Sequence, residues 1–298
     1  MGKSQDKLIV ILGPTASGKS DVAIKLAQKF DGEIISVDSR QIYRGMDIGS
    51  GKITEEEQNM AKHYMLDIVE PTEEYSAGKF KREAEKIIED ILSRKKLPIL
   101  CGGTGFWIKS IVENITFPKV KPNPDLRKKL EKEETEELFE KLKKLDPKRA
   151  SSIDANNRPR LIRAIEIAKE LGSVPEIKSD PKYDSLQIGI SREKEILHER
   201  IKLNIQKRFN LGMIEEVEKM HKNGIPWKRI ESFGLSYSLI PQYLRGEIES
   251  KKELIERIYL AEKNYAKRQM TWFQRDKRIR WLKDFKQIEK ETREFLEK

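Results

Sequence analysis

The sequence of 298 residues contains little of what several classes of protein require. Its one cysteine, Cys101, excludes a disulfide framework within the chain and a cysteine-rich zinc site. Because the chain has only three histidines, we do not expect a histidine-based metal site. The apolar run at residues 8–12 is too short for the core of a signal peptide, and no later segment reaches the roughly 18 apolar residues of a membrane span. We therefore expect a cytoplasmic protein with no membrane partner.

Charge is abundant, and its positive excess is unevenly distributed. Residues 1–100 contain 16 basic and 17 acidic residues, a net charge of −1. Because the whole chain has a net charge of +10, the remaining 198 residues have a net charge of +11. Residues 259–286 combine nine basic residues with three acidic ones and include Tyr265, Trp272, Phe273 and Trp281. Cations in such a segment can contact RNA phosphates while rings stack on bases. The alternative is a solvated helix whose aromatic side chains face the core.

The first 115 residues alternate between strand and helix patterns, which is typical of a parallel sheet covered by helices. The expected strands are residues 7–12, 33–37 and 97–101, and the expected helices are residues 18–30 and 76–94. Three prolines within residues 117–124 then indicate a linker.

The pattern beyond the linker is mostly helical. The expected helices are residues 125–145, 158–171, 193–223, 241–245 and 254–273, with one strand at residues 186–190. We therefore expect an α/β protein with a P-loop NTPase-like parallel-sheet core. Residues 1–115 and 186–298 would form this catalytic core with its C-terminal helices, and residues 116–185 a helical insert.

A complete phosphate-binding loop motif, G-x-x-x-x-G-K-[ST], lies between the first expected strand and helix. It consists of Gly13, Pro14, Thr15, Ala16, Ser17, Gly18, Lys19 and Ser20. Its glycines let backbone N–H groups surround an anion, and the following helix directs its positive end to the same place. Lys19 adds a positive charge, and the Ser20 hydroxyl can bind Mg²⁺. The motif predicts a diphosphate or triphosphate site without indicating which.

Polar residues follow two further strands, at the sheet edge where ligands of such folds bind. Asp38 follows the second strand, where it could bind Mg²⁺ indirectly, act as a general base or cap the next turn. Thr104, in a glycine-rich segment after the third strand, could point into a site or cap the next helix. Cys101 is expected to be a core residue because no basic neighbour activates it.

Several motifs coincide in one order along nearly the whole chain. They are residues 13–20 (GPTASGKS), 38–49 (DSRQIYRGMDIG), 66–77 (LDIVEPTEEYSA), 102–105 (GGTG), 157–166 (NRPRLIRAIE) and 266–273 (AKRQMTWF). Together they resemble the bacterial tRNA dimethylallyltransferases, also called tRNA isopentenyltransferases. The segments 38–49 and 266–273 are far more specific than the phosphate-binding loop.

The resemblance implies transfer of a dimethylallyl group from dimethylallyl diphosphate to N6 of the adenosine 3′-adjacent to the anticodon of tRNA, with release of diphosphate. The phosphate loop would bind the diphosphate with Mg²⁺ near Ser20, Asp38 would be the base, and Thr104 would contact diphosphate or substrate. A monomer is expected, with the insert binding tRNA. The residues implied in contact with the tRNA anticodon stem-loop are Asp38, Ser39, Arg40, Gln41, Thr104, Arg127, Pro159, Arg160, Leu161, Ile162, Arg163, Lys267, Arg268, Gln269, Thr271 and Trp272.

The chain departs from the family pattern in two segments. Family members usually read R-I-x-x-R where this chain has Arg200-Ile201-Lys202-Leu203-Asn204, so the second arginine, associated with the diphosphate, is replaced by Asn204. Arg208 lies one helical turn further, and we hypothesise that it takes this catalytic place. The second departure is at Gly234-Leu235-Ser236-Tyr237, a segment in which family members usually contain adjacent G-Y.

Three other functions remain open at this point. A small-molecule P-loop kinase would explain the loop but neither the basic aromatic C-terminal region nor residues 38–41. An RNA-binding protein with a degenerate P-loop would bind tRNA without transfer. Prenylation of free adenine nucleotides shares the chemistry but needs neither the insert nor the basic C-terminal helices.

Overall fold

The computed structural model describes residues 5–298, which contain one six-stranded parallel sheet. Its strand order is β3-β2-β4-β1-β5-β6. The strands are β1 (Lys7–Leu12), β2 (Gly32–Val37), β3 (His63–Tyr64), β4 (Leu97–Gly102), β5 (Asp184–Ile190) and β6 (Arg280–Leu282). The α/β class with a parallel-sheet core is thereby confirmed.

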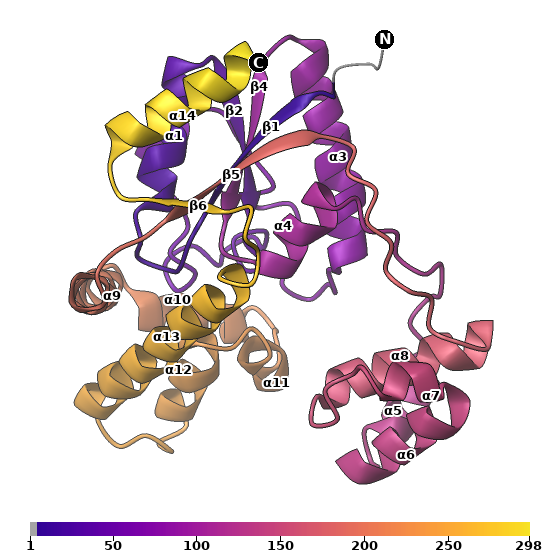
Figure 1. Ribbon diagram of the computed structural model, residues 1–298. Coiled ribbons are helices and arrows are strands. Elements are labelled where there is room, and N and C mark those ends of the chain that lie inside the picture. Colours follow the sequence, from indigo (N-terminus) through magenta and orange to yellow (C-terminus); the bar gives the residue numbers. More distant parts are fainter. Residues whose placement is uncertain (1–4) are drawn as a thin grey trace. The chain divides into compact units, whose positions relative to one another are not determined.

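Helices cover both faces of the sheet because its central strands carry apolar side chains on both sides. Ile9 and Ile11 of β1 pack on one face with side chains of α1 and α14, whereas Leu8, Val10 and Leu12 pack on the other with α3 and α4. These helices are α1 (Lys19–Lys29), α3 (Ala77–Ser93), α4 (Gly105–Val112) and α14 (Phe285–Glu297). Figure 1 shows the resulting layers.

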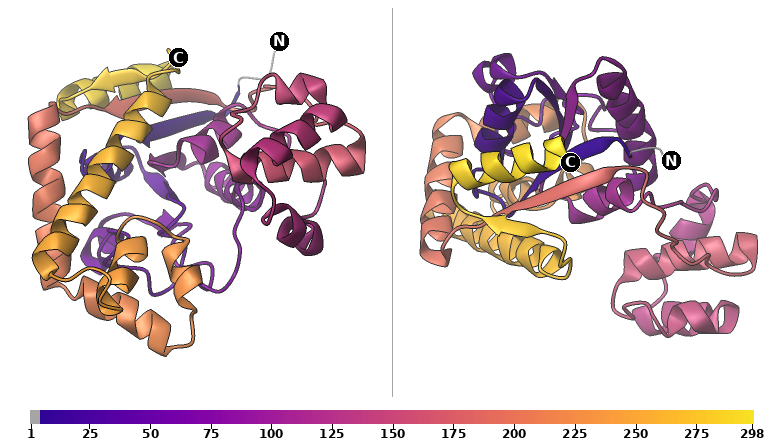
Figure 2. Two further views of the ribbon diagram at one scale, coloured as in Figure 1. Left: turned by 90° about the horizontal axis from the view of Figure 1, so that it is seen from below. Right: turned by 45° about the horizontal axis from the view of Figure 1, so that its top comes forward.

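A second group of helices lies near the carboxyl ends of the strands (Figure 1). The helices of this group are α9 (Lys194–Asn210), α10 (Met213–Lys222), α11 (Trp227–Glu231), α12 (Ser236–Leu244) and α13 (Lys251–Phe273). The long helix α13 runs beside α9 (Figure 2), and Lys202 of α9 lies over the ring of Tyr259 of α13. The short α2 (Glu55–Met60) follows β2. This arrangement places helices opposite the sheet edge at which ligands of parallel α/β folds bind.

The chain divides into two compact units, each of which we describe by itself. One comprises the residues up to Asn114 together with Pro181–Lys298, and the other comprises Ile115–Asp180. The boundaries expected from sequence were 115/116 and 185/186. The second unit consists of α5 (Pro124–Leu130), α6 (Thr135–Leu145), α7 (Pro147–Ala150) and α8 (Arg158–Leu171). Its own hydrophobic core includes Leu138, Leu142, Leu161 and Ile165, all fully buried.

Two helices expected to be continuous are broken. The segment 125–145 is interrupted because Glu134 forms a capping box with Glu137, which starts α6 at Thr135. The segment 193–223 is interrupted at Gly212, whose φ of +93° is a left-handed conformation that suits glycine. The sequence patterns also missed the short edge strands β3 and β6.

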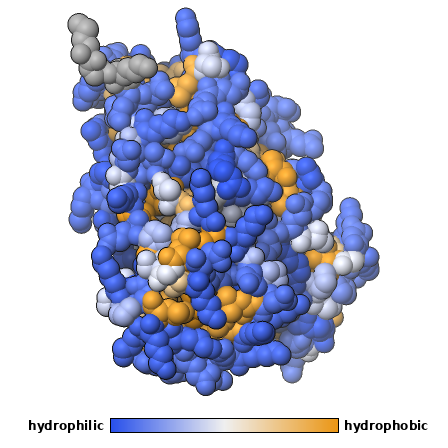
Figure 3. Space-filling view, turned by 90° about the vertical axis from the view of Figure 1, so that its right-hand side faces the viewer, coloured by the Kyte–Doolittle hydropathy of each residue, from blue (hydrophilic) through white to orange (hydrophobic). Residues whose placement is uncertain are grey.

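Within residues 5–298, no helix combines the length and apolar character needed to cross a membrane. The face drawn in Figure 3 is largely hydrophilic, with apolar side chains scattered over it. Such a surface fits a chain in which 37% of the residues are charged.

Candidate active site

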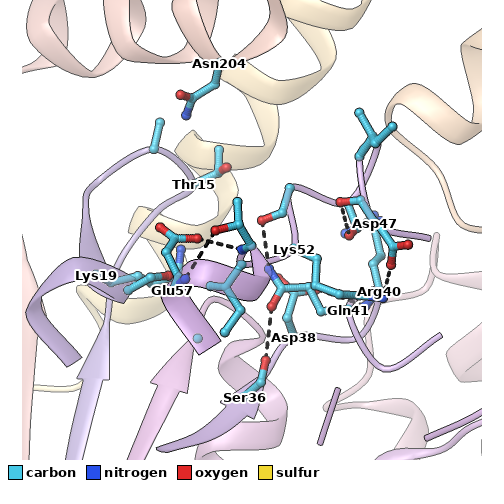
Figure 4. A pocket seen from close by; sticks show the side chains of 18 of the residues that line it. Thr15, Lys19, Ser36, Asp38, Arg40, Gln41, Asp47, Lys52, Glu57 and Asn204 are labelled. Atoms are coloured by element: carbon cyan, nitrogen blue, oxygen red, sulfur yellow. Dashed lines mark hydrogen bonds and ion pairs between the residues drawn. The ribbon is translucent and has the colours of Figure 1, made fainter. Parts of the chain in front are cut away.

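A cavity of about 600 Å³ lies where the carboxyl ends of β1, β2 and β4 meet the helices α9 and α13. Lys19 and Ser20 of the phosphate loop, Asp38 and Gln41 line it together with Asn204 of α9. Figure 4 shows Lys19, Asp38, Gln41 and Asn204 among the side chains that line this cavity. Asp38 thus shares the cavity with the phosphate loop, as the strand-end rule predicts, whereas Thr104 is not among the residues that line it.

The phosphate loop has the backbone shape that an anion site needs. Gly13 has a φ of +156°, and a Cβ atom on it would lie only 2.9 Å from the carbonyl oxygen of Ile190. Gly18 begins α1 in a left-handed conformation without a side-chain cap. The first-turn N–H groups of α1 are therefore not capped by a side chain and are available to a ligand. Lys19 Nζ donates to the carbonyl oxygen of Pro14 at 3.3 Å, which holds its charge beside the loop.

Gln269 of α13 connects the phosphate loop to the glycine-rich loop after β4. Its Oε1 accepts a hydrogen bond from the N–H of Thr15 at 2.8 Å, and its Nε2 donates to the carbonyl oxygen of Gly103 at 3.0 Å. A Cβ atom on Gly103 would lie 2.2 Å from this Nε2, and one on Gly105 would lie 2.2 Å from Cδ1 of Trp272. The glycines of this loop therefore make room for α13. Gln269, implied by the resemblance to contact tRNA, is buried and engaged by both loops.

Asp38 and Thr104 organise the segment after β2. The Oδ1 atom of Asp38 accepts a hydrogen bond from the N–H of Arg40 at 2.9 Å, so the capping interaction is present while the side chain also lines the cavity. Thr104 Oγ1 accepts from the N–H of Ser39 at 3.1 Å. Thr104 does occupy the N-cap position of α4, but its side chain makes no capping bond there. Thr104 thus ties residues 38–40 to the loop after β4.

The side chains of Arg40 and Gln41 in this segment have protein partners. Arg40 Nε donates to the carbonyl oxygen of Phe233 at 2.7 Å, and its guanidinium lies 5.2 Å from the ring centroid of Tyr265. Gln41 Oε1 accepts from Ser36 Oγ at 3.2 Å. Burial, and secondly the negative charge of Asp38, raises the pKa of Tyr265. Tyr265 is therefore neutral at physiological pH and forms an aromatic wall close to Asp38.

Cys101 is a buried core residue, as expected, and borders the cavity. It is buried at the end of β4, and burial raises the pKa of its thiol to about 11. A thiol with this pKa is protonated at neutral pH and is a poor nucleophile.

Arg208, which we expected to replace the missing arginine, is held by the protein. Its Nη1 donates to the carbonyl oxygen of Gly49 at 3.0 Å, and its Nη2 forms an ion pair with Glu262 of α13. Its Nε donates to the carbonyl oxygen of Asn204 at 3.2 Å. Arg208 lines the cavity, yet each of its three donor nitrogens already has an acceptor.

Two arginines that the motifs did not assign lie closer to the phosphate loop. Arg200 Nε donates to the carbonyl oxygen of Ala16 at 2.7 Å, and Arg192 Nε donates to that of Ser17 at 3.1 Å. Arg200 belongs to the segment in which Asn204 is the departure, so the sequence carried a signal for it. No sequence signal indicated Arg192, because its hydrogen bond to a main-chain carbonyl 175 residues away forms only in the folded chain.

The comparisons with known proteins agree with this geometry. The sequence model of the family described as IPP transferase matches residues 41–276. The chain is 44% identical over 287 residues to a tRNA dimethylallyltransferase of Acetivibrio thermocellus, which covers 93% of this chain and 91% of the relative. It is 39% identical to tRNA dimethylallyltransferase 1 of Geotalea uraniireducens, with 97% and 96% covered. The chain belongs to the IPP transferase family.

Solved structures support the same assignment. The full-length tRNA isopentenylpyrophosphate transferase of Bacillus halodurans superposes with a TM-score of 0.73 at 34% identity, covering 98% of this chain and 96% of the other. A eukaryotic dimethylallyltransferase acting on tRNA superposes with a TM-score of 0.78 at 28% identity, covering 90% and 70%. The family indicated by the sequence motifs is thereby confirmed.

In this IPP transferase, the insert uses several of its expected tRNA contacts internally. Glu166, almost fully buried, accepts hydrogen bonds from Arg127 at 2.9 Å and from Arg163 at 3.1 Å. Arg163, implied by the resemblance to contact tRNA, is therefore paired with a carboxylate of the insert itself. Leu161 and Ile162, also implied in tRNA contact, pack in the core of the insert. Pro159 and Arg160 are exposed.

The C-terminal helix α13 of this IPP transferase presents the other expected contacts. Lys267, Arg268 and Thr271 are exposed, whereas Trp272 is half-buried against Gly105 and meets Phe106 edge-to-face at 6.5 Å between ring centroids. The helix therefore has a buried side that joins the loops of the site and a basic exposed side.

Proposed function

We propose that this protein transfers a dimethylallyl group from dimethylallyl diphosphate to N6 of the adenosine 3′-adjacent to the anticodon in tRNA and releases diphosphate. The observation that carries the proposal is that Asp38 and the phosphate-loop residues Lys19 and Ser20 line one cavity. One cavity thereby offers both a binding site for the leaving diphosphate and a base for the attacking amine. Membership of a family whose named relatives are tRNA dimethylallyltransferases supports the choice of substrates.

In this reaction, the N6 amine attacks C1 of the dimethylallyl group, and the bond from C1 to the diphosphate oxygen breaks with its electron pair on the oxygen. The carboxylate of Asp38 accepts the proton that the amine loses. An exocyclic amine is a weak nucleophile, so a positioned base contributes roughly 10²- to 10⁴-fold. Lys19 and the first N–H groups of α1 stabilise the charge that develops on the leaving diphosphate.

The residues of the site fit a magnesium ion that takes most of its ligands from the substrate phosphates and few from the protein. Among residues 5–298 no group of three or more His, Cys, Asp or Glu side chains is arranged to hold a metal. Ser20, at the start of α1, lines the cavity and supplies a hydroxyl oxygen, and Mg²⁺ commonly combines few protein ligands with phosphate oxygens and water. When bound, Mg²⁺ neutralises part of the diphosphate charge.

The acceptor reaches this cavity as a base turned out of the anticodon loop, because N6 is not accessible to the enzyme within a stacked loop. Lys267, Arg268 and Thr271 on the exposed side of α13 contact the tRNA backbone in this proposal. One chain builds the whole cavity, so we propose a monomer, acting in the cytoplasm on its tRNA substrate.

The deciding experiment measures transfer of labelled dimethylallyl to an anticodon stem-loop by wild type and by Asp38→Asn. We expect a fall in kcat of about 100-fold or more, since the variant keeps the shape of the side chain but lacks a base. Asp90→Asn, an exposed carboxylate on α3, is the matched control and should retain wild-type turnover. A wild-type rate for Asp38→Asn would remove Asp38 as the base.

The same assay separates the other functions. Consumption of ATP with a small acceptor would indicate a kinase, and tight stem-loop binding without transfer would indicate an RNA-binding protein. Equal transfer to free adenine nucleotides would show that the RNA is not required.

A further inference from the structure

The guanidinium groups of Arg200, which lines the cavity, and of Arg192, which is not among its lining residues, are both held against the phosphate loop. Their Nε atoms donate to the carbonyl oxygens of Ala16 and Ser17. Their Nη2 atoms lie close to Gly18: a Cβ atom on this glycine would be 3.6 Å from Nη2 of Arg200 and 3.7 Å from Nη2 of Arg192. Gly18 directly precedes Lys19 and begins α1. The outer N–H groups of both arginines thus lie near the helix end that attracts anions.

The acceptors that hold these two guanidinium groups are neutral main-chain carbonyl oxygens. Within the described part of the chain, neither Arg192 nor Arg200 forms an ion pair with a carboxylate within 4.0 Å, although Asp21 Oδ2 lies 3.8 Å from the same point beside Gly18. Arg208 of the same helix as Arg200 differs, since it is paired with Glu262. Cations gathered without a carboxylate partner raise the local potential and favour an anionic ligand.

We infer that Arg192 and Arg200 bind the diphosphate of the substrate and stabilise it as it leaves. The inference rests on the proposed function and deepens it. A diphosphate carries more negative charge than Lys19 alone offsets, and the neutral amide of Asn204 adds no charge. The planar guanidinium matches phosphate oxygens with paired N–H groups. The bonds from Nε to the loop carbonyls fix each guanidinium in advance, so less freedom is lost on binding.

The chemical step is balanced without any proton from these arginines. The bond between C1 and the diphosphate oxygen breaks, its electron pair remains on that oxygen, and both arginines stay protonated while donating hydrogen bonds to it. Their contribution therefore grows with the charge on the leaving group, which lowers the barrier of the transfer step.

The test is the binding of inorganic pyrophosphate to the full-length protein, measured by titration calorimetry at several salt concentrations. The variants are Arg200→Gln and Arg192→Gln, which lose the charge but keep an amide donor for the loop carbonyl. We expect each to weaken pyrophosphate binding about tenfold and to reduce its salt dependence, because a charge-assisted hydrogen bond is lost. Arg200→Lys keeps the positive charge but lacks the paired N–H groups of a guanidinium. It should therefore bind pyrophosphate more tightly than Arg200→Gln and more weakly than wild type.

The matched control is Lys202→Gln, on the same helix, whose cation pairs with Glu199 at the surface. It should bind pyrophosphate like wild type. Wild-type affinity and salt dependence in both arginine variants would overturn the inference, as would equal losses in Arg200→Lys and Arg200→Gln. If the variants lose pyrophosphate binding while the wild type transfers nothing to RNA, the anion site at these arginines stands, whereas the proposed function and their role in the transfer step fail.

Discussion

The insert and the phosphate loop use arginine in opposite ways. In the insert, Arg127 and Arg163 converge on the buried carboxylate of Glu166. Burial opposes the charge of Glu166, yet the hydrogen bonds from Arg127, from the N–H of Asn123 and from Arg163 together hold its pKa below its ordinary value. At the phosphate loop, Arg192 and Arg200 donate to carbonyl oxygens and form no such pair within residues 5–298.

The difference shows that a basic residue in a motif does not reveal its role until its partners are known. An arginine that neutralises a buried carboxylate contributes to the fold, because breaking such a pair leaves an uncompensated charge. An arginine whose acceptors are all neutral has no paired carboxylate to offset its positive charge, so that charge can attract an anionic ligand. Substitutions in the two regions should therefore affect different measurements.

The largest expected effect is on the stability of the insert. Arg127→Ala removes the paired hydrogen bonds to Glu166, and we expect a loss of about 3 kcal/mol in the free energy of unfolding of this unit. Urea denaturation followed by hydrogen exchange in residues 115–180 measures it. Lys128→Ala, on the same helix and exposed, is the control and should change stability by less than about 0.5 kcal/mol. Unchanged stability in Arg127→Ala, with weaker RNA binding alone, would contradict the structural role.

Much of the sheet and one side of the site could be predicted from local patterns. The phosphate loop and Asp38 each follow a long apolar strand, and the strand-end rule places them together. The two-residue strand β3 and the three-residue β6 are too short to leave a periodic pattern. The break before Thr135 depends on a capping box among many acidic residues, which composition alone does not single out.

The other side of the site depends on contacts between distant parts of the chain. Gln269 meets Thr15 across 254 positions, and Arg192 meets Ser17 across 175. No spacing rule joins such residues. The resemblance placed Gln269 in tRNA contact, whereas its hydrogen bonds lie inside the protein. The glycines of residues 102–105 predicted a close approach, and the structure shows Gln269 and Trp272 making it.

An intermediate effect is expected where α13 joins the two loops of the site. Gln269→Met fills a similar volume but removes both hydrogen bonds, leaving the N–H of Thr15 and the carbonyl of Gly103 without their partner. We expect kcat/KM for dimethylallyl diphosphate to fall about 10- to 30-fold, corresponding to roughly 1.5–2 kcal/mol. Steady-state kinetics at saturating stem-loop measure this.

The direct affinity for the stem-loop should stay within about twofold, because Gln269 is buried. Gln274→Met, an exposed glutamine at the end of the same helix, is the control and should leave kcat/KM unchanged. A variant that weakens RNA binding while leaving the diphosphate KM intact would return Gln269 to the tRNA contacts implied by the resemblance.

The smallest effect is expected at the exposed side of α13, where charge serves neither a buried pair nor the diphosphate. Lys267→Gln should change the free energy of unfolding by less than about 0.5 kcal/mol, since its exposed side chain forms no ion pair within residues 5–298. Stem-loop affinity should fall only a few-fold, and the slope of log affinity against log salt should decrease by about 0.7–0.9, as for one lost phosphate contact. Pyrophosphate affinity should not change. An unaltered salt slope would remove Lys267 from the RNA contacts proposed for α13.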